Sequence, residues 1–310
     1  MTEDAVLRQR CREKEPPPGD EISGQMIKTE KPFFLLAVPF LLGSLVVTGC
    51  GRVVVTSTPS PTQTPLPTLT STVSPTPGLP DTGWERLRPG LERRRINLPG
   101  DTSEPFESLF MLRLEPDDYR FDVAYHPDPQ TLEAWQSETN ALIVLNGGYF
   151  RGEDGAYVPN GLTVVGGAAI GSTYGEFAGM FAVTMDGPEL RWLAQEPYDP
   201  NEPLLAALQS FPVLVKPDGV MGFPEQDEDH RSARRSVVAE DRNGRVLFIV
   251  ASSGNFTLHR LSAYLVASDL DLHIAINLDG GPSSGMLLAI PLEKVPALVP
   301  LPIVITVLDR

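Results

Sequence analysis

Hydrophobic and polar positions follow two regular patterns beyond residue 108. From Tyr119 to Tyr125 every second residue is apolar, which is the period of a half-buried strand. Elsewhere, short apolar runs end at turn-forming residues, and these runs predict further strands. The predicted strands are 109–114, 119–125, 142–145, 161–165, 212–216, 274–276, 286–290 and 303–308.

Two further pairs of apolar segments are separated by turn dipeptides. The dipeptides are Asp186-Gly187 and Asn243-Gly244, and both readily adopt the positive φ angles that tight hairpins need. The flanking segments are 180–185 with 189–193, and 235–239 with 246–250. Each pair is therefore predicted to form a β-hairpin.

Three segments carry helical signals. In 258–267, Leu258, Leu261 and Leu265 fall on one face of an amphipathic helix. Segments 131–138 and 201–209 are predicted as shorter helices. The chain is therefore predicted to be an α+β protein, with a mixed β-sheet, several β-hairpins and two or three covering helices.

The first 82 residues lack the pattern of a packed domain. Residues 1–25 are polar and read as an N-terminal extension, with Met26 as the expected true start. Residues 26–50 read as a signal peptide, because two lysines precede a short apolar run that ends at Cys50. Thr48-Gly49-Cys50 resembles a bacterial lipoprotein signal, in which Cys50 would carry the lipid. A transmembrane anchor is the alternative, for which the run is short.

Residues 51–82 are crowded with Thr, Ser and Pro and contain few large apolar side chains. Such a segment cannot bury a core, and its prolines favour an extended chain, so it is predicted to be a linker. Residues 83–310 remain as one domain, long enough to enclose a sizeable core. The expected location is the extracytoplasmic face of the cell envelope, with the lipid on Cys50 holding the domain to the membrane.

Charge and cysteine content narrow the class of protein. The formal net charge of -15 argues against nucleic acid as a partner, because phosphate backbones are bound by clustered Lys and Arg. The two cysteines, Cys11 and Cys50, lie outside the predicted domain, which excludes a disulfide framework and a cysteine metal site there. No cofactor is predicted, and a metal bound by Asp279 and backbone oxygens stays open.

The candidate chemistry lies where two buried strands end. The run 274–276 leads to Asn277 and to Asp279-Gly280-Gly281, and the run 142–145 leads to Asn146-Gly147-Gly148. Glycines let a backbone approach a ligand closely, and ligands often bind beyond the carboxyl ends of strands. Two such ends with matching Asn/Asp-Gly-Gly chemistry predict one shared polar site, although each could also be a plain turn.

The motifs occur in the order of a known family. They are Asn146-Gly147-Gly148-Tyr149-Phe150, Pro159-Asn160-Gly161-Leu162, Gln209-Ser210-Phe211-Pro212, Ala233-Arg234-Arg235-Ser236 and the stretch from Asn277 through Asp279 and Gly280 to Ser284. In these the chain resembles the phosphodiester glycosidases, whose animal members uncover mannose 6-phosphate by removing N-acetylglucosamine. The resemblance covers about 140–310 well.

This resemblance implies a hydrolase that cleaves the bond between a sugar and a phosphodiester. The expected location, and not the motifs, indicates a glycan or glycoconjugate of the cell envelope as the substrate. Its expected catalytic residues are Asp279, Arg235 and Asn146. Asp279 would act as the central carboxylate, and the Arg235 guanidinium suits phosphate oxygens. The second carboxylate of the familiar two-carboxylate scheme is not identified by the sequence. The expected substrate-binding residues are Gly147, Gly148, Tyr149, Gln209, Arg234, Gly280, Gly281, Ser283 and Ser284. The alternatives are a non-catalytic lipoprotein that binds phosphorylated or acidic glycans, and a phosphodiesterase that cleaves the P–O bond.

Overall fold

The computed structural model describes residues 80–100, 106–175, 178–228 and 230–310. The predicted N-terminal extension, the signal segment with Cys50 and nearly all of the linker lie outside the described residues. The described residues begin at Pro80, a few residues before the predicted domain boundary at 83. Asp81 forms a β-bridge with Ile96, and its carboxylate accepts hydrogen bonds from Arg94.

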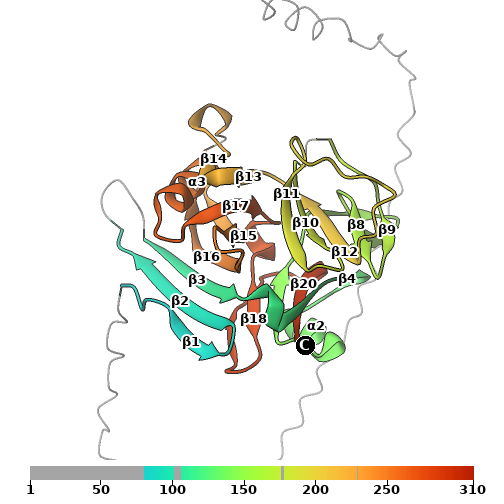
Figure 1. Cartoon of the computed structure of the whole chain (residues 1–310), viewed down its shortest axis with the longest axis horizontal. Helices are drawn as coiled ribbons and strands as arrows, with labels where there is room; N and C mark the ends of the chain where they lie inside the picture. The colour runs from blue at the N-terminus through green and yellow to red at the C-terminus, as the bar shows by residue number, and fades with distance from the viewer. Residues whose placement is uncertain (1–79, 101–105, 176–177, 229) are drawn as a thin grey trace, which may run out of the picture. The chain divides into compact units, whose positions relative to one another are not determined.

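The largest sheet has eight strands and is antiparallel throughout. It contains the strand that leads to Asp279, near the centre of the orange elements in Figure 1. Its strands, in spatial order, are β1 (Glu85–Arg88), β2 (Leu91–Leu98), β3 (Glu107–Leu114), β16 (Val246–Phe256), β15 (Ala233–Asp241), β17 (Leu272–Asn277), β13 (Val213–Lys216) and β14 (Val220–Met221).

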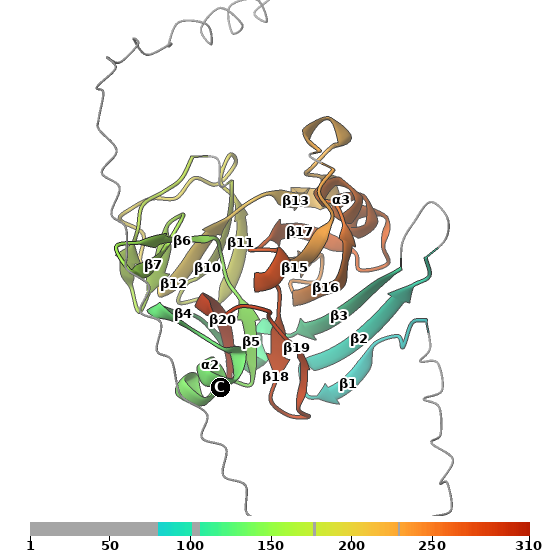
Figure 2. The ribbon, with the colours of Figure 1, turned by 180° about the vertical axis from the view of Figure 1, so that it is seen from behind.

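Two five-stranded sheets complete the core. One has the order β11 (Pro188–Trp192), β10 (Gly179–Val183), β12 (Ala206–Ser210), β8 (Thr163–Val165) and β9 (Ala168–Ile170). The other, seen from behind in Figure 2, has the order β19 (Glu293–Val295), β18 (Met286–Leu288), β5 (Ile143–Asn146), β20 (Leu301–Asp309) and β4 (Tyr119–Gln130). β6 (Phe150–Glu153) and β7 (Ala156–Pro159) pair as a separate hairpin.

One hydrophobic core joins the three larger sheets. It contains Phe248 and Ile276 from the eight-stranded sheet, Leu145 and Ile305 from the sheet of β5, and Phe181 from the sheet of β12, all at most 2% exposed. Because each sheet turns one face into this core, the strand ends of all three can meet at one place. The site described below lies at such a meeting.

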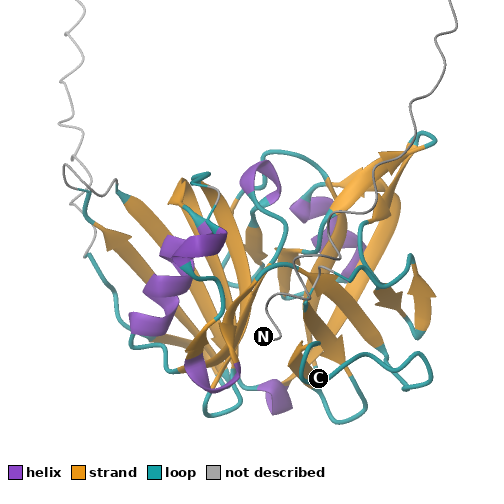
Figure 3. Cartoon of the chain, turned by 90° about the horizontal axis from the view of Figure 1, so that it is seen from above, coloured by secondary structure: helices purple, strands orange, loops and turns teal. Residues whose placement is uncertain are grey.

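Two α-helices pack on outer faces of the sheets (Figure 3). Helix α3 (Leu258–Ala267) lies beside β13 and β14, and buries Leu258, Leu261 and Leu265. Helix α2 (Leu132–Thr139) packs on β5 and β18 through Leu132 and Trp135. A threonine side chain caps each helix: Thr131 accepts from the Ala134 N–H, and Thr257 from the Arg260 N–H. The short 3₁₀ helices are Pro116–Asp118, Pro217–Gly219, Glu225–Asp227 and Gly281–Ser283.

The predicted strand-rich α+β fold is confirmed, with its hairpins and two helices. Two details differ. Every described strand pair is antiparallel, where a mixed sheet was predicted. The helix predicted for 201–209 is wrong, because Ala206–Ser210 forms strand β12 between β10 and β8. Among the described residues, no helix is long and apolar enough to cross a bilayer.

Candidate active site

The two Gly-Gly turns predicted from the sequence lie in direct contact. The backbone N–H of Asp279, just past the end of β17, donates to the Gly147 carbonyl oxygen at 3.1 Å. The side-chain amide of Asn146, the last residue of β5, donates to the Asp279 carbonyl oxygen at 2.8 Å. Strand ends from two different sheets are thus fastened to each other at the backbone of Asp279.

The absence of side chains at the glycines makes this contact possible. A Cβ on Gly147 would lie 2.7 Å from the Ile303 side chain and 3.0 Å from the Ile303 backbone. A Cβ on Gly148 would lie 3.0 Å from the Gln209 carbonyl oxygen on β12, which belongs to the third sheet. Gly281 has a φ of +61°, a conformation that costs other residues energy. Glycine is therefore needed for close packing of these turns as much as for approach to a ligand.

Asp279 is the half-buried carboxylate at this junction. Its Oδ1 accepts a hydrogen bond from the Gly280 N–H at 2.9 Å. Burial raises the pKa of Asp279 above its ordinary value, and hydrogen bonds from the Ser283 side chain and from Gly280 offset part of that increase. A carboxyl group with a raised pKa at a partly open position is suited to acid–base or nucleophilic chemistry.

Arg235 extends from β15 toward Gly280. Its side chain is 7% exposed, and its Nη1 lies 3.6 Å from the position that a Cβ on Gly280 would take. Nε donates to the Phe256 carbonyl oxygen at 3.2 Å, and Nη2 donates to the Arg231 carbonyl oxygen at 2.7 Å. These bonds hold the guanidinium at one orientation, so it would meet an anion with little loss of conformational entropy.

Tyr149 lies close enough to both the carboxylate and the guanidinium for each charge to act on its hydroxyl. Burial raises the pKa of the Tyr149 hydroxyl, the nearby Asp279 charge raises it further, and the Arg235 charge opposes both effects. The hydroxyl donates to the Phe211 carbonyl oxygen at 2.9 Å and accepts from the Asn277 amide at 2.8 Å. Both charged groups therefore act on one hydroxyl, which places Asp279, Arg235 and Tyr149 in a single site.

Asn277 ties this network to β17. Its fully buried amide Nδ2 also contacts the carbonyl oxygens of Phe211 and Leu278 at 2.9 and 2.7 Å. The Ser210 hydroxyl donates to the Asn277 carbonyl oxygen at 2.6 Å. Asn277 was quoted in the sequence motif but not proposed as a site residue. Its residue type alone could not show that its side chain reaches a tyrosine 128 positions away.

The structure also places the other predicted site residues that carry side chains. Asn146 and Gln209 are buried with their side chains engaged by backbone groups, since Asn146 Oδ1 accepts from Gly285 and Gln209 Oε1 accepts from Leu162 and Tyr174. Ser283 and Ser284 follow Asp279 in the same turn and are buried. Arg234 points elsewhere, and its Nη2 donates to the Pro296 carbonyl oxygen at 2.8 Å.

The sequence of the chain matches one known protein family. The sequence profile of the phosphodiester glycosidases matches residues 139–302, which is about half of the chain and includes both Gly-Gly turns. The chain belongs to the phosphodiester glycosidase family. No curated protein matches it.

Three solved structures share the fold of this chain. The zebrafish N-acetylglucosamine-1-phosphodiester alpha-N-acetylglucosaminidase catalytic domain, auto-inhibited by its pro-peptide, has a TM-score of 0.58 at 16% identity, covering 73% of this chain and 86% of its own. A hypothetical protein from Synechocystis has a TM-score of 0.57 at 12% identity, covering 73% of this chain and 63% of its own. A putative exported protein from Burkholderia pseudomallei has a TM-score of 0.51 at 12% identity, covering 66% and 74%.

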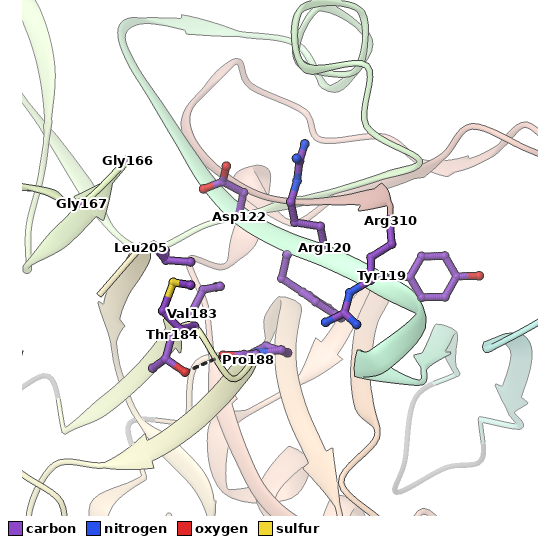
Figure 4. A pocket seen from close by; sticks show the side chains of 13 residues that line it. Tyr119, Arg120, Asp122, Gly166, Gly167, Val183, Thr184, Pro188, Leu205 and Arg310 are labelled. Carbon is purple, nitrogen blue, oxygen red and sulfur yellow. Dashed lines mark hydrogen bonds between the residues drawn. The ribbon is translucent and has the colours of Figure 1, made fainter. Parts of the chain in front are cut away.

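Within the described part of this chain, no group of three or more His, Cys, Asp or Glu side chains is placed to hold a metal ion. A separate cavity of about 410 Å³ lies at the start of β4, the β10–β11 turn and Arg310 (Figure 4). Thr184 donates to the Gly187 carbonyl oxygen in its wall. Its lining includes neither Gly-Gly turn, so it is distinct from the site around Asp279.

The raised pKa of Asp279 predicts a stability effect of Asp279→Asn. A carboxyl whose pKa is higher in the folded state stabilises the fold below its unfolded pKa of about 4, and loses this contribution as pH rises through the folded pKa. The asparagine variant does not ionise. Its melting temperature is therefore expected to exceed that of the wild type at pH 7, with the difference shrinking toward pH 4. Calorimetry across this pH range checks the trend.

The matched control for this measurement is Asp186→Asn, on the exposed β10–β11 turn. Its melting-temperature difference from the wild type should stay nearly constant over the same pH range. A pH-independent difference for Asp279→Asn would show that burial of its carboxyl does not govern the stability of the site.

Proposed function

We propose that this chain hydrolyses glycosyl phosphodiesters by cleaving the bond between the anomeric carbon and the phosphate oxygen. The observation that carries the proposal is that a half-buried carboxylate and a fixed guanidinium both lie beside Gly280, in a chain of the phosphodiester glycosidase family. A substrate at this glycine could place its sugar carbon at Asp279 and its phosphate at Arg235.

The two groups have complementary tasks in this reaction. As the C–O bond breaks, its electron pair leaves with the phosphate oxygen, and positive charge develops on the sugar ring. Arg235 would stabilise the departing phosphate, while the Asp279 carboxylate would stabilise the ring, attack it or deprotonate a water. Water supplies the new anomeric hydroxyl, and its other proton goes to the phosphate monoester or to solvent. A phosphate monoester is a weak base, so this leaving group needs charge stabilisation more than protonation.

Asn146, Tyr149 and Asn277 support the site in this proposal. Asn146 fixes the backbone of Asp279, and Asn277 fixes the Tyr149 hydroxyl beside both charged groups. The four glycines Gly147, Gly148, Gly280 and Gly281 keep side chains away from the turns, and Ser283 donates a hydrogen bond to the carboxylate. Gln209 and Arg234 would act on the substrate only through the backbone groups that their side chains bind. Ser284 is fully buried in the turn after Asp279 and would contribute through the packing of that turn.

Hydrolysis in ¹⁸O-labelled water tests which bond breaks. The full chain would be incubated with a panel of sugar-1-phosphate esters, and the products would be analysed by mass spectrometry. Label in the free sugar supports the proposal, since water then attacks the anomeric carbon. Label in the phosphate would instead show a phosphodiesterase. Binding of the same esters without any release would show a glycan-binding protein.

We also propose that the enzyme works at the cell envelope, held by a lipid on Cys50. The support comes from the sequence, where a basic segment, an apolar run and Thr48-Gly49-Cys50 have the order of a lipoprotein signal. Metabolic labelling with a fatty-acid probe tests it. The wild-type chain should take up the label and stay with the membrane fraction, and Cys50→Ala should do neither. A labelled Cys50→Ala chain would contradict the assignment.

A further inference from the structure

An apolar cavity of about 600 Å³ adjoins the candidate active site. Eight of its ten lining residues are apolar or glycine, so it offers few partners to a ligand rich in hydroxyl groups. The two charged residues are Lys216 and Asp227. The Lys216 ammonium lies 4.9 Å from the centre of the Trp192 ring, so the aromatic face already engages part of its charge.

Two backbone segments connect this cavity to the site. Phe211 lines the cavity, and its carbonyl oxygen accepts hydrogen bonds from Tyr149 and Asn277. Leu258 also lines it, two residues after Phe256, whose carbonyl oxygen accepts from Arg235. The backbone that accepts hydrogen bonds from Tyr149 and Arg235 therefore leads directly into the wall of the cavity.

The position of the cavity relative to Asp279 indicates which part of a substrate it would hold. Its described lining residues include none from 146–150 or 279–285, the segments that form the two Gly-Gly turns. A group in the cavity would thus extend from the phosphate at Arg235, away from the sugar at Asp279. In a glycosyl phosphodiester, that group is the alcohol.

Apolar surface continues outward from the cavity along the edge strand β14. Val220 is 57% exposed and Met221 is 37% exposed, although both belong to a strand of the largest sheet. Met221 precedes Gly222, a lining residue, and Val220 pairs with Lys216. A ligand longer than the cavity would therefore meet apolar side chains beyond it.

We infer that this cavity binds the alcohol part of the substrate, and that this alcohol is a long-chain aliphatic one. The inference rests on the proposed function, because only a phosphodiester joins such an alcohol to the group at Arg235. Trp192, Phe211 and Leu258 would exclude water from the chain, and Arg235 would hold the phosphate at its head.

A series of glucose 1-phosphate esters, from methyl to octyl, tests this on the full-length wild-type chain. Each methylene that becomes buried should raise kcat/KM by about fourfold. Burial of about four of the seven added methylenes should therefore raise kcat/KM for the octyl ester at least about a hundredfold above that for the methyl ester. The series also includes the diester in which glucose 1-phosphate is joined to the 6-hydroxyl of a second glucose. Its kcat/KM should stay close to that of the methyl ester. Preference for this sugar ester would overturn the assignment of an aliphatic alcohol.

Ala178→Phe tests whether the cavity causes the chain-length dependence. Ala178 is half-buried in the cavity wall, and a phenyl ring there would occupy the space of the chain. The ratio of kcat/KM for octyl over methyl should fall about tenfold or more. Leu205→Phe is the matched control, because Leu205 is 45% exposed and lines the other cavity, and its ratio should equal that of the wild type. An unchanged ratio in Ala178→Phe would overturn the proposal.

Inhibition of the wild-type enzyme by alkyl phosphates tests the cavity without a variant, and therefore remains available if Ala178→Phe does not fold. Octyl phosphate should bind at least about tenfold more tightly than methyl phosphate. Hydrolysis of every ester at one rate, with equal binding of the two phosphates, would overturn the apolar subsite and leave the hydrolase intact. Binding of octyl phosphate would be monitored through Trp192 fluorescence. If octyl phosphate bound tightly and no ester were hydrolysed, the apolar binding site would stand and the proposed hydrolase activity would be overturned.

Discussion

Asp279→Asn is expected to lower kcat on a glycosyl phosphodiester by about a thousandfold or more. The change removes one negative charge and one basic oxygen but keeps the shape of the side chain. Asparagine can still accept the hydrogen bonds that Gly280 and Ser283 give to the carboxylate. A positioned carboxyl that transfers a proton or attacks carbon contributes a factor of about 10² to 10⁴, and charge stabilisation adds to it. Release of reducing sugar under saturating substrate measures the effect.

The affinity of this variant for the substrate separates catalysis from structure. Arg235 and the Tyr149 network are unchanged in Asp279→Asn, so the dissociation constant, measured by calorimetry, should stay within about threefold of the wild type. Asp186→Asn is the matched control and should retain full activity. Wild-type turnover by Asp279→Asn would show that another group supplies the chemistry, and equal loss of turnover and binding would show a damaged site.

The sequence predicted that the two Gly-Gly turns share one site because each turn has a signature in its own few residues. A buried strand that ends in Asn or Asp followed by two glycines reads clearly from hydrophobicity and residue type. Asn146 and Asp279 indeed lie at one junction, joined by a 2.8 Å hydrogen bond. What the pattern could not predict is that these strands belong to different sheets, since that depends on pairings distant in sequence.

The error at 201–209 has a tertiary cause. The segment is rich in Leu and Ala, which favour helices when neighbouring strands are not considered. In the fold, Ala206–Ser210 is fully buried between β10 and β8, and sheet pairing outweighs intrinsic helix preference there. The same pairing brings Gln209 and Ser210 to the site. Because 201–209 was predicted as a helix, the sequence did not show that a third sheet contributes residues to the site.

The N-terminal ribbon β1–β2 was missed for an electrostatic reason. Its sequence contains Arg93, Arg94 and Arg95 in a row, which gives little sign of a strand. In the fold these arginines meet carboxylates from distant segments: Arg94 donates to Asp81 and Asp269, and Arg93 and Arg95 pair with Glu293. The partner of Arg94 at Asp269 is 175 residues away. No local pattern can show that such charges are neutralised.

Replacing Arg235 should cost nearly as much activity as replacing Asp279, but through the phosphate. Arg235→Ala is expected to lower kcat/KM for a phosphodiester by about a thousandfold, because guanidinium groups that stabilise a departing phosphoryl charge contribute factors of this size. Arg235→Lys keeps the charge and loses the fork of donors. It should recover part of the activity, to about a hundredfold below the wild type.

Substitution of Arg235 would also reduce activity if the side chain only supported the structure, because its Nε and Nη2 donate to the Phe256 and Arg231 carbonyl oxygens. Competition by inorganic phosphate separates the two roles. Phosphate should inhibit the wild type and, at equal melting temperature, inhibit Arg235→Lys at least about tenfold more weakly. The matched control is Arg234→Lys, because that side chain donates to the Pro296 carbonyl oxygen, away from Gly280, and should leave the inhibition unchanged. If phosphate inhibited Arg235→Lys and the wild type equally, Arg235 would be a support for the strand end, and the anion would have to bind elsewhere.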